Sequence, residues 1–302
     1  MIDRNKLQYQ SKNGKMYLGS CEELIPEYTN TDFEPVNLIL TSPPFPLNRA
    51  KQYGNMNGNE YLKWMTVLAK LFSSVLAPNG SVVIELGNAW ESGKPIQSTL
   101  PIEALLAFKN SGEFNLCQEF IHYNPARLPA PIEWVNKKRI RVKDSFTRIW
   151  WLSKCTNPKA NNRNVLVPYS KQMRKLLKTS TYNAGKRPSE YVIGETSFSN
   201  DNGGAIPGNV IIASNTVSND SYLTYCKENK LEIHPARMPH EIPEFFIQLL
   251  TEPGDIILDP FAGSNTTGKV AEELGRQWLS IEAEQKYIDG SIGRFPNDII
   301  RR

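Results

Sequence analysis

Apolar residues along the chain are grouped in short runs, and longer amphipathic segments lie between them. The clearest apolar runs, most of which end in turn or loop residues, are at 15–18, 36–40, 81–86, 256–258 and 278–281. Helical periodicity is strongest at residues 60–76, 102–111, 243–250 and 266–274. Uninterrupted apolar runs of this length are typical of strands that are buried on both faces of a parallel sheet. The alternation predicts an α/β fold with a doubly wound sheet.

Residues 156–230 do not follow this pattern. They are rich in Asn, Ser, Gly and Pro, their periodicity is weak, and the composition of residues 201–208 is typical of a loop. A chain of 302 residues is long enough for one large domain or two smaller ones. We therefore predict an irregular domain at 156–230, inserted between one half of the sheet domain at 1–155 and the other half at 231–302.

The composition excludes several classes of protein. Hydrophobic residues make up 40% of the chain and no residue type dominates, which argues against a disordered, collagen-like or coiled-coil protein. No apolar stretch approaches the roughly 18 residues of a membrane span, and the N-terminus lacks the apolar core of a secretory signal. The four cysteines have no metal-ligand spacing, so we expect no bound metal and a location in the reducing cytoplasm.

The positive charge of the chain is concentrated in one segment. The formal net charge is only +4, from 35 Lys and Arg against 31 Asp and Glu. Residues 137–187 hold 15 of those basic residues and a single acid, Asp144, so the rest of the chain has 20 basic and 30 acidic residues. Aromatic residues are interleaved with the charges. Because a solvated surface usually mixes both signs, this segment predicts a site for a polyanion such as a nucleic acid.

A glycine-containing loop follows the apolar run at 256–258. Its sequence, Asp-Pro-Phe-Ala-Gly-Ser-Asn-Thr-Thr-Gly at 259–268, leads into the helix predicted at 266–274. In such a strand, loop and helix arrangement, backbone amides can contact an anionic group, and Glu282 at the end of the next strand can bind ribose hydroxyls. The loop is neither GxGxxG nor a Walker sequence, which disfavours NAD and nucleoside triphosphates. We predict another nucleoside-containing cofactor; an ordinary capped turn is the alternative.

A second motif, Thr-Ser-Pro-Pro-Phe at residues 41–45, follows the strand predicted at 36–40. The two prolines fix φ and remove two backbone donors, which leaves carbonyl groups free at the end of a strand. Ser42 Oγ, the Pro43 carbonyl and the ring of Phe45 can therefore hold an amino group and stack on a planar ring. A stiff loop packed by an aromatic ring is the purely structural alternative.

Together the two motifs resemble those of the DNA amino-methyltransferases, which transfer a methyl group from S-adenosylmethionine to an exocyclic base nitrogen. The catalytic motif precedes the cofactor motif and the basic insert lies between them, an order similar to that of the circularly permuted beta class. Further stretches resemble the N4-cytosine enzymes of type II restriction-modification systems, namely residues 53–55, 131–137, 139–144, 150–151, 198–204, 234–237 and 249–253. The resemblance implies a Rossmann-like S-adenosylmethionine-dependent methyltransferase fold, circularly permuted, with a target-recognition domain at 156–230.

The resemblance also implies how the catalytic loop acts. Ser42 Oγ and the carbonyl of Pro43 accept hydrogen bonds from the N4 amine, Pro44 stiffens the loop, and Phe45 stacks on a cytosine flipped out of the duplex. No covalent enzyme intermediate is needed, and catalysis rests on positioning and on acceptors for the developing positive charge. The sequence offers no obvious strong general base.

The resemblance also implies which residues contact each part of the cofactor. Phe261 contacts the adenine and Glu282 the ribose. The methionine part is surrounded by Asp259, Gly263 and the backbone amides of Ser264, Asn265 and Thr266, and closed over by His234 and Arg237. A structural ion pair is the alternative for Arg237. The family usually has Gly-Asp where this chain has Gly19-Ser20; Ser20 can still hydrogen-bond the adenine, but the role of the acid is not transferred.

The expected partner is double-stranded DNA. Basic residues of the 137–187 segment are expected to contact phosphates: Lys137, Lys138, Arg139, Arg141, Lys143, Lys186 and Arg187. Similarity within the insert implies CAGCTG as a candidate recognition sequence, with a restriction endonuclease that acts on the same site without contacting this chain. No feature of the sequence indicates an oligomeric state.

Three other functions are considered. The N6-adenine enzymes usually have Asp at the position of Ser42, so Ser42 favours cytosine. A DNA-binding protein that keeps the fold but has lost catalysis would agree with the missing acid at position 20. Enzymes that methylate RNA or a protein glutamine tend to have Asn at the position of Ser42 and to lack such an insert.

Overall fold

The computed structural model describes residues 2–30, 33–45, 58–179, 184–194, 198, 200–214, 220–295 and 299–301; residues 53–55 of the resemblance lie outside them. The chain forms two compact units, one of residues 1–160 and 209–302 and the other of residues 161–208. The second unit is narrower than the insert predicted at 156–230. The difference arises because the segment after residue 208 contributes a strand to the sheet and a helix packed on the C-terminal part of the first unit.

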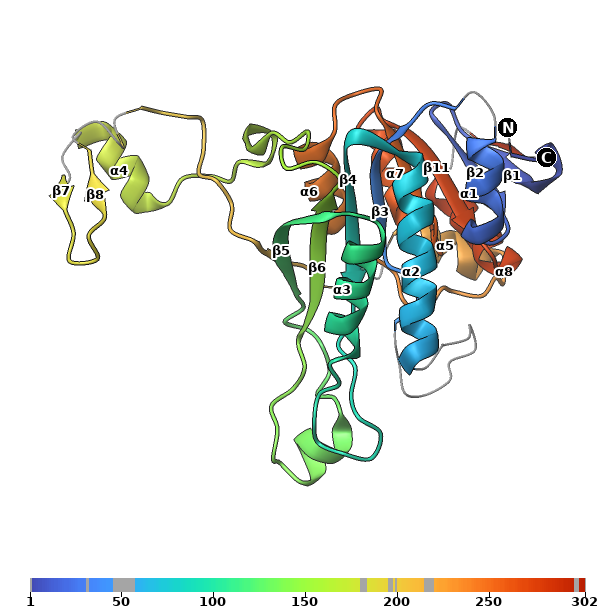
Figure 1. Ribbon diagram of the computed structural model, residues 1–302, viewed down its shortest axis with the longest axis horizontal. Coiled ribbons are helices and arrows are strands. Elements are labelled where there is room, and N and C mark those ends of the chain that lie inside the picture. Colours follow the sequence, from blue (N-terminus) through green and yellow to red (C-terminus); the bar gives the residue numbers. More distant parts are fainter. Residues whose placement is uncertain are drawn as a thin grey trace. The chain divides into compact units, whose positions relative to one another are not determined.

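A sheet of ten strands, counted over the described residues, forms the centre of the first unit (Figure 1). In spatial order the strands are β12 (Ile300–Arg301), β1 (Leu7–Gln10), β2 (Gly14–Leu18), β11 (Gln277–Glu282), β10 (Ile256–Asp259), β3 (Val36–Thr41), β4 (Leu76–Leu86), β6 (Phe146–Ser153), β5 (Asn115–Tyr123) and β9 (Val210–Ile212). The strands from β2 to β4 are parallel, and β6 runs antiparallel to both β4 and β5. The five predicted apolar runs are these parallel strands, as the sequence pattern indicated.

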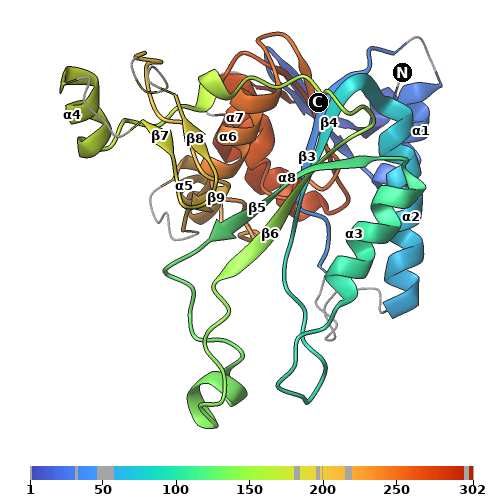
Figure 2. The same ribbon diagram turned by 60° about the vertical axis from the view of Figure 1, so that its left-hand side comes forward.

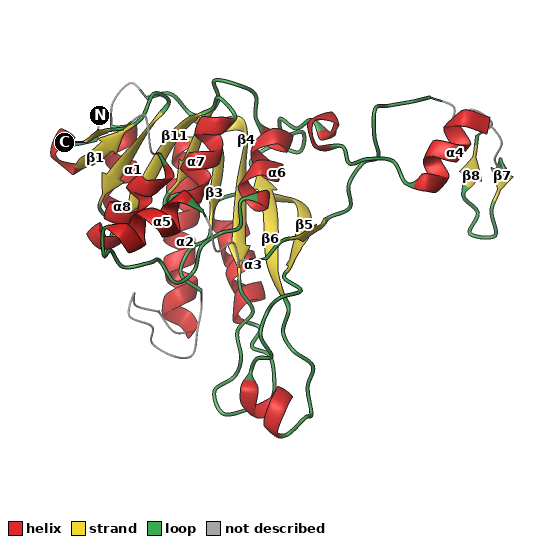
Figure 3. Cartoon of the chain, turned by 180° about the vertical axis from the view of Figure 1, so that it is seen from behind, coloured by secondary structure: helices red, strands yellow, loops and turns green. Residues whose placement is uncertain are grey.

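Helices cover both faces of the sheet (Figures 1 and 3). One side carries α1 (Cys21–Thr29), α2 (Gly58–Val75) and α3 (Leu100–Ser111). The other carries α5 (Ser221–Glu228), α6 (Glu241–Leu250), α7 (Thr266–Glu273) and α8 (Gln285–Ser291). The helices form where apolar residues recur at helical spacing; in α2, Tyr61, Leu68 and Phe72 are at most 1% exposed. Burying each such side chain contributes roughly 1.5–3 kcal/mol, which fixes the helices on the sheet.

The direction in which the chain winds reverses between the neighbouring strands β3 and β10. From β3 the chain crosses through α2 to β4, and from β10 it crosses through α7 to β11 on the opposite side. The neighbours β3 and β10 are in register, with Ile257 beside Leu38 and Leu258 beside Ile39. Ligands of open α/β sheets bind at the carboxyl ends of the two strands where the winding reverses. The loops at 42–45 and 260–265 begin at those two ends.

A long connection between β5 and β6 extends beyond the end of the sheet and carries a short π-helix, Glu133–Lys137 (Figure 2). The unit of residues 161–208 is built separately, from a 3-10 turn (Asn162–Val165), α4 (Lys171–Thr179) and the hairpin of β7 (Gly185–Lys186) and β8 (Val192–Ile193). Among the described helices, none combines the length and the hydropathy that crossing a membrane requires.

Candidate active site

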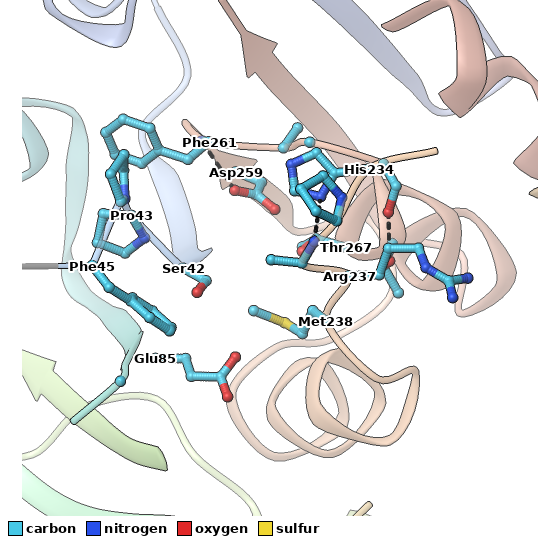
Figure 4. A pocket seen from close by; sticks show the side chains of 18 of the residues that line it. Ser42, Pro43, Phe45, Glu85, His234, Arg237, Met238, Asp259, Phe261 and Thr267 are labelled. Atoms are coloured by element: carbon cyan, nitrogen blue, oxygen red, sulfur yellow. Dashed lines mark hydrogen bonds between the residues drawn. The ribbon is translucent and has the colours of Figure 1, made fainter. Parts of the chain in front are cut away.

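A cavity of about 630 Å³ opens at the carboxyl ends of the parallel strands. It lies in the first unit, between the loop after β3 and the loop after β10 (Figure 4). The predicted catalytic and cofactor residues that line it are Ser20, Ser42, Pro43, Pro44, Phe45, His234, Arg237, Asp259, Phe261, Gly263, Ser264, Thr266 and Glu282. The fold therefore brings together two motifs that lie more than 200 residues apart in the sequence.

The catalytic loop carries two acceptors on the cavity wall, Ser42 Oγ and the Pro43 carbonyl. At its base, the buried hydroxyl of Thr41 donates to Asp259 Oδ1 at 2.8 Å, which ties the loop to the cofactor motif. Tyr61 donates from its hydroxyl to the carbonyl of Pro44 at 3.1 Å. No described residue forms a hydrogen bond with Ser42 Oγ or with the carbonyl of Pro43. These two oxygens are available to an amino group in the cavity.

The ring of Phe45 needs the glycine beneath it. A Cβ atom at Gly87 would lie 2.5 Å from ring atoms of Phe45, closer than side chains tolerate. In Figure 4 the ring points into the same cavity as the hydroxyl of Ser42. A planar group held by Ser42 would therefore have an aromatic face beside it.

The loop after β10 depends on the conformation of Gly263. Its φ of +51° is in the left-handed region, and an added Cβ would lie 3.0 Å from His234 Nε2. The Gly263 amide donates to Glu282 Oε2 at 2.7 Å, and the amide of Glu284 donates to Oε1 at 3.0 Å. Burial raises the pKa of Glu282, while these two amides oppose that shift. The carboxylate is held at the cavity edge with acceptor capacity to spare for hydroxyl groups.

Asp259 is an acid in an unfavourable environment. Its side chain is 4% exposed. Burial raises its pKa to about 6, although hydrogen bonds from Thr267, Thr41 and the Phe261 amide favour the ionised form. A cationic ligand group in the cavity would compensate the buried charge.

The side chain of His234 lies beside the loop after β10, and its ring is neutral. Burial lowers its pKa to about 4, and the amide of Ala236 donates to Nδ1 at 3.3 Å. Its ring contacts Tyr287 with centroids 4.3 Å apart. The proton of the neutral ring is therefore on Nε2, the atom that faces Gly263.

Asn265, predicted to contact the cofactor, does not line the cavity. Its side chain is fully buried and accepts hydrogen bonds from the Gly268 amide at 3.1 Å and from Ser280 Oγ at 2.8 Å. Its amide group donates to the hydroxyl of Tyr9 at 3.0 Å, and its backbone N–H is taken by Ala262. Asn265 is the N-cap of α7 and stabilises the loop from inside the protein. The predicted cofactor contact of Asn265 is therefore corrected.

Two further predicted residues combine a place on the cavity with a structural contact. Arg237 pairs with Asp220 at 3.3 Å, which is the ion pair considered as its alternative. Ser20 caps α1 by accepting from the Glu23 amide at 3.3 Å. Both still line the cavity.

Several acids and their partners on the cavity wall were not predicted from the sequence. Glu22 lies near Phe261: Trp64 donates to its carboxylate at 2.6 Å and packs against the ring of Phe261 with centroids 5.6 Å apart. Glu85, His122 and Thr147 form a buried cluster on the side of β4. An acid inside an otherwise apolar strand was the available signal for Glu85.

The predicted DNA contacts differ in their exposure and in their partners. Lys137, Lys138 and Arg139 are exposed; the first two pair with Glu133 at the surface, and Lys138 also lies over the ring of Trp134. In the second unit Lys186 is exposed and pairs with Glu190 at 3.4 Å, and Arg187 is half-buried.

Arg141 and Lys143 contact other parts of the first unit. Arg141 stacks on Trp90 at 3.6 Å and donates to the Pro95 carbonyl, and Lys143 donates to the carbonyls of Pro125 and Arg127. Lys143 therefore links two parts of the β5–β6 connection, and Arg141 joins this connection to the segment between β4 and α3. Neither contact was predicted from the sequence.

Comparison with known proteins agrees with this geometry. The family described as DNA methylase matches residues 36–293. The type II methyltransferase M.PvuII of Proteus hauseri is 44% identical over 292 residues, which cover 96% of this chain and 86% of the relative. The type II methyltransferase M.BglII of Bacillus subtilis is 29% identical over 280 residues, with 91% and 67% covered.

Solved structures give the same result. The cytosine-N4-specific PvuII DNA methyltransferase has a TM-score of 0.76 at 38% identity, covering 95% of this chain and 87% of that chain. The M1.HpyAVI–SAM complex has a TM-score of 0.57 at 19% identity, covering 94% and 100%, a likeness of fold alone. The methyltransferase fold predicted from the sequence is confirmed. Since the family match includes both loops of the cavity, the chain belongs to the DNA methylase family.

Proposed function

We propose that this chain is a site-specific DNA methyltransferase that transfers a methyl group from S-adenosylmethionine to the N4 amine of a cytosine in double-stranded DNA. The observation that carries the proposal is a pair of acceptors, Ser42 Oγ and the Pro43 carbonyl, that receive no hydrogen bond from a described residue and face the cofactor loop across one cavity. The similarity to a cytosine-N4-specific enzyme over nearly the whole chain supports the choice of base.

The residues on the other side of the cavity fit S-adenosylmethionine. Phe261 offers an apolar face for the adenine and Glu282 offers acceptors for the ribose hydroxyls. Asp259 supplies a buried carboxylate for a cationic group, and neutral His234 adds no competing charge. When bound, the cofactor supplies an electrophilic methyl group on a cationic sulfur.

The catalytic loop acts by orientation and electrostatics. Ser42 Oγ and the Pro43 carbonyl accept hydrogen bonds from the amine and draw its lone pair out of conjugation with the ring. They also stabilise the positive charge that develops on the nitrogen. Phe45 stacks on the cytosine, which has to leave the duplex because its amine is otherwise paired and stacked.

DNA is held by the exposed cations. Lys137, Lys138 and Arg139 lie on the β5–β6 connection, parts of which line the cavity. In the second unit, α4 exposes Lys171, Arg174, Lys175 and Lys178. We infer that this unit, within the 156–230 insert, recognises the target sequence. In the amino-acid sequence the insert lies between the catalytic half at 1–155 and the cofactor half at 231–302, which is the permuted order of the beta class. CAGCTG is the proposed site, and a separate restriction endonuclease of the same specificity is the proposed companion.

One experiment tests product and site together. Plasmid DNA is treated with the protein and labelled S-adenosylmethionine, its nucleosides are analysed by mass spectrometry, and modified cytosines are mapped at base resolution. We expect N4-methylcytosine within CAGCTG. N6-methyladenine as the sole product would overturn the choice of base, and absence of cofactor binding by calorimetry would favour a DNA-binding protein without catalysis.

A further inference from the structure

Glu85, His122 and Thr147 form a buried polar cluster on the cavity wall. They come from the neighbouring strands β4, β5 and β6, are 6%, 4% and 4% exposed, and all line the cavity. In Figure 4 the carboxyl group of Glu85 points into the same space as Ser42 and Met238. Burying a carboxyl group costs free energy unless hydrogen bonds or an opposite charge compensate it, so the presence of Glu85 beside the proposed position of the amine needs an explanation.

The hydrogen bonds of the cluster converge on one carboxyl oxygen. Glu85 Oε1 accepts from Thr147 Oγ1 at 2.6 Å and is 2.8 Å from His122 Nδ1. No described residue donates to Oε2, so that atom has free lone pairs in the cavity. Holding one oxygen by two neighbours fixes the direction of the other.

The ring of His122 is held on both sides. Nδ1 lies 2.8 Å from Glu85 Oε1 and 3.1 Å from Thr147 Oγ1, and Nε2 lies 3.2 Å from the carbonyl of Ala213. Contacts at both ring nitrogens fix the orientation of the imidazole, and the ring in turn fixes the carboxyl group of Glu85.

We propose that Glu85 is the proton acceptor of the methyl transfer, a role that rests on the proposed function. As the amine nitrogen forms its bond to the methyl carbon, the sulfur–methyl bond breaks and its electron pair stays on sulfur. The nitrogen then carries one proton too many, and Glu85 Oε2 takes it and later releases it to solvent. A protonated amine on an aromatic ring is a strong acid, so a carboxylate is basic enough. His122 and Thr147 are positioning residues.

The test compares Glu85→Gln with the wild-type enzyme in single-turnover methylation of a CAGCTG duplex. The amide keeps the size of the side chain but cannot accept the proton, so the rate should fall about 100-fold or more. The dissociation constants of S-adenosylmethionine and DNA should stay within about twofold, and the KM of DNA should not rise. Glu103→Gln, on α3 and away from the cavity, is the matched control and should behave as wild type.

A second variant covers the case in which Glu85→Gln does not fold. Thr147→Val keeps the shape but removes one of the two contacts to Oε1, and should lower the rate about threefold to tenfold without changing either dissociation constant. An unchanged rate in either folded variant overturns the proposal, as does a loss of ligand binding that parallels the loss of rate. Failure of the proposed function would show separately, as the absence of N4-methylcytosine with the wild-type enzyme.

Discussion

Lowering the pH from 7 to 5 should weaken the binding of S-adenosylmethionine through Asp259. This side chain is buried at the cavity, and burial raises its pKa to about 6. The ligand is positively charged at its sulfur and its amino group, so it binds best to the protein with Asp259 ionised. Protons therefore compete with the ligand in the range where most carboxyl groups are already fully ionised.

The magnitude follows from the pKa. With a value of about 6, about nine tenths of the free protein has Asp259 ionised at pH 7 and about one tenth at pH 5. Apparent affinity scales with the competent fraction, so Kd should rise about tenfold over this interval. Binding at pH 6 should release about half a proton. Glu282 acts in the same direction, because burial raises its pKa too.

Isothermal titration calorimetry at pH 7, 6 and 5, in two buffers of different ionisation enthalpy, measures both quantities. Asp259→Asn removes the titrating group: it should bind more weakly at pH 7 and show a flatter pH dependence. A wild-type Kd that changes less than about twofold, in protein shown by circular dichroism to stay folded, would refute the assignment.

The same group affects stability with a defined sign. Its folded pKa lies above the usual 3.8, so the folded state binds more protons and stability falls as the pH rises through about 6. The shift of about two units corresponds to about 3 kcal/mol. Urea unfolding of the ligand-free protein at pH 4 and 8 should show that decrease in the wild type and less of it in Asp259→Asn.

Three other substitutions test the remaining parts of the site. Ser42→Ala removes one amine acceptor and should lower turnover by about 100-fold while DNA binding, measured by gel shift, stays the same; equal losses in both would contradict the acceptor role. Gly263→Ala forces a residue with a side chain into a left-handed conformation beside His234. It should lower the free energy of unfolding, measured in urea, by about 1–2 kcal/mol and weaken cofactor binding at least about tenfold. The matched Gly275→Ala, at a φ of +71° with open space around it, should lose only stability. Exchange of Lys137 and Lys138 for Gln should reduce the slope of log affinity against log salt by about 2, and an unchanged slope would remove them from the DNA interface.

The central fold could be predicted because parallel strands are buried on both faces. Their apolar runs are continuous, and each of the five predicted runs is a strand of the sheet. The limits were harder to predict: β4 starts at Leu76 and runs through Asn79 and Gly80, a pair typical of a turn. Pairing with β3 shifts register in that region, so the sheet absorbs the irregularity.

The site could be predicted only where its residues follow one another in the sequence. The loops at 42–45 and 259–264 carry their chemistry in local motifs that end strands. Glu85, His122 and Thr147 lie on separate strands, and only the pairing of β4, β6 and β5 brings them together. The backbone amide of Asn265, expected to face the cofactor, donates to the carbonyl of Ala262 instead, a turn contact that the sequence does not indicate.

The hydrogen bond from Thr41 to Asp259 joins the loop proposed to hold the base to the loop proposed to hold the cofactor. A ligand that fixes Asp259 in its ionised form strengthens this acceptor and so steadies the residues that follow Thr41. Any such influence has to be mutual, because the free energy that links two binding events is the same whichever occurs first. The protein should therefore bind the cofactor and its DNA target cooperatively. Dissociation of the demethylated cofactor should lower the affinity for the methylated DNA.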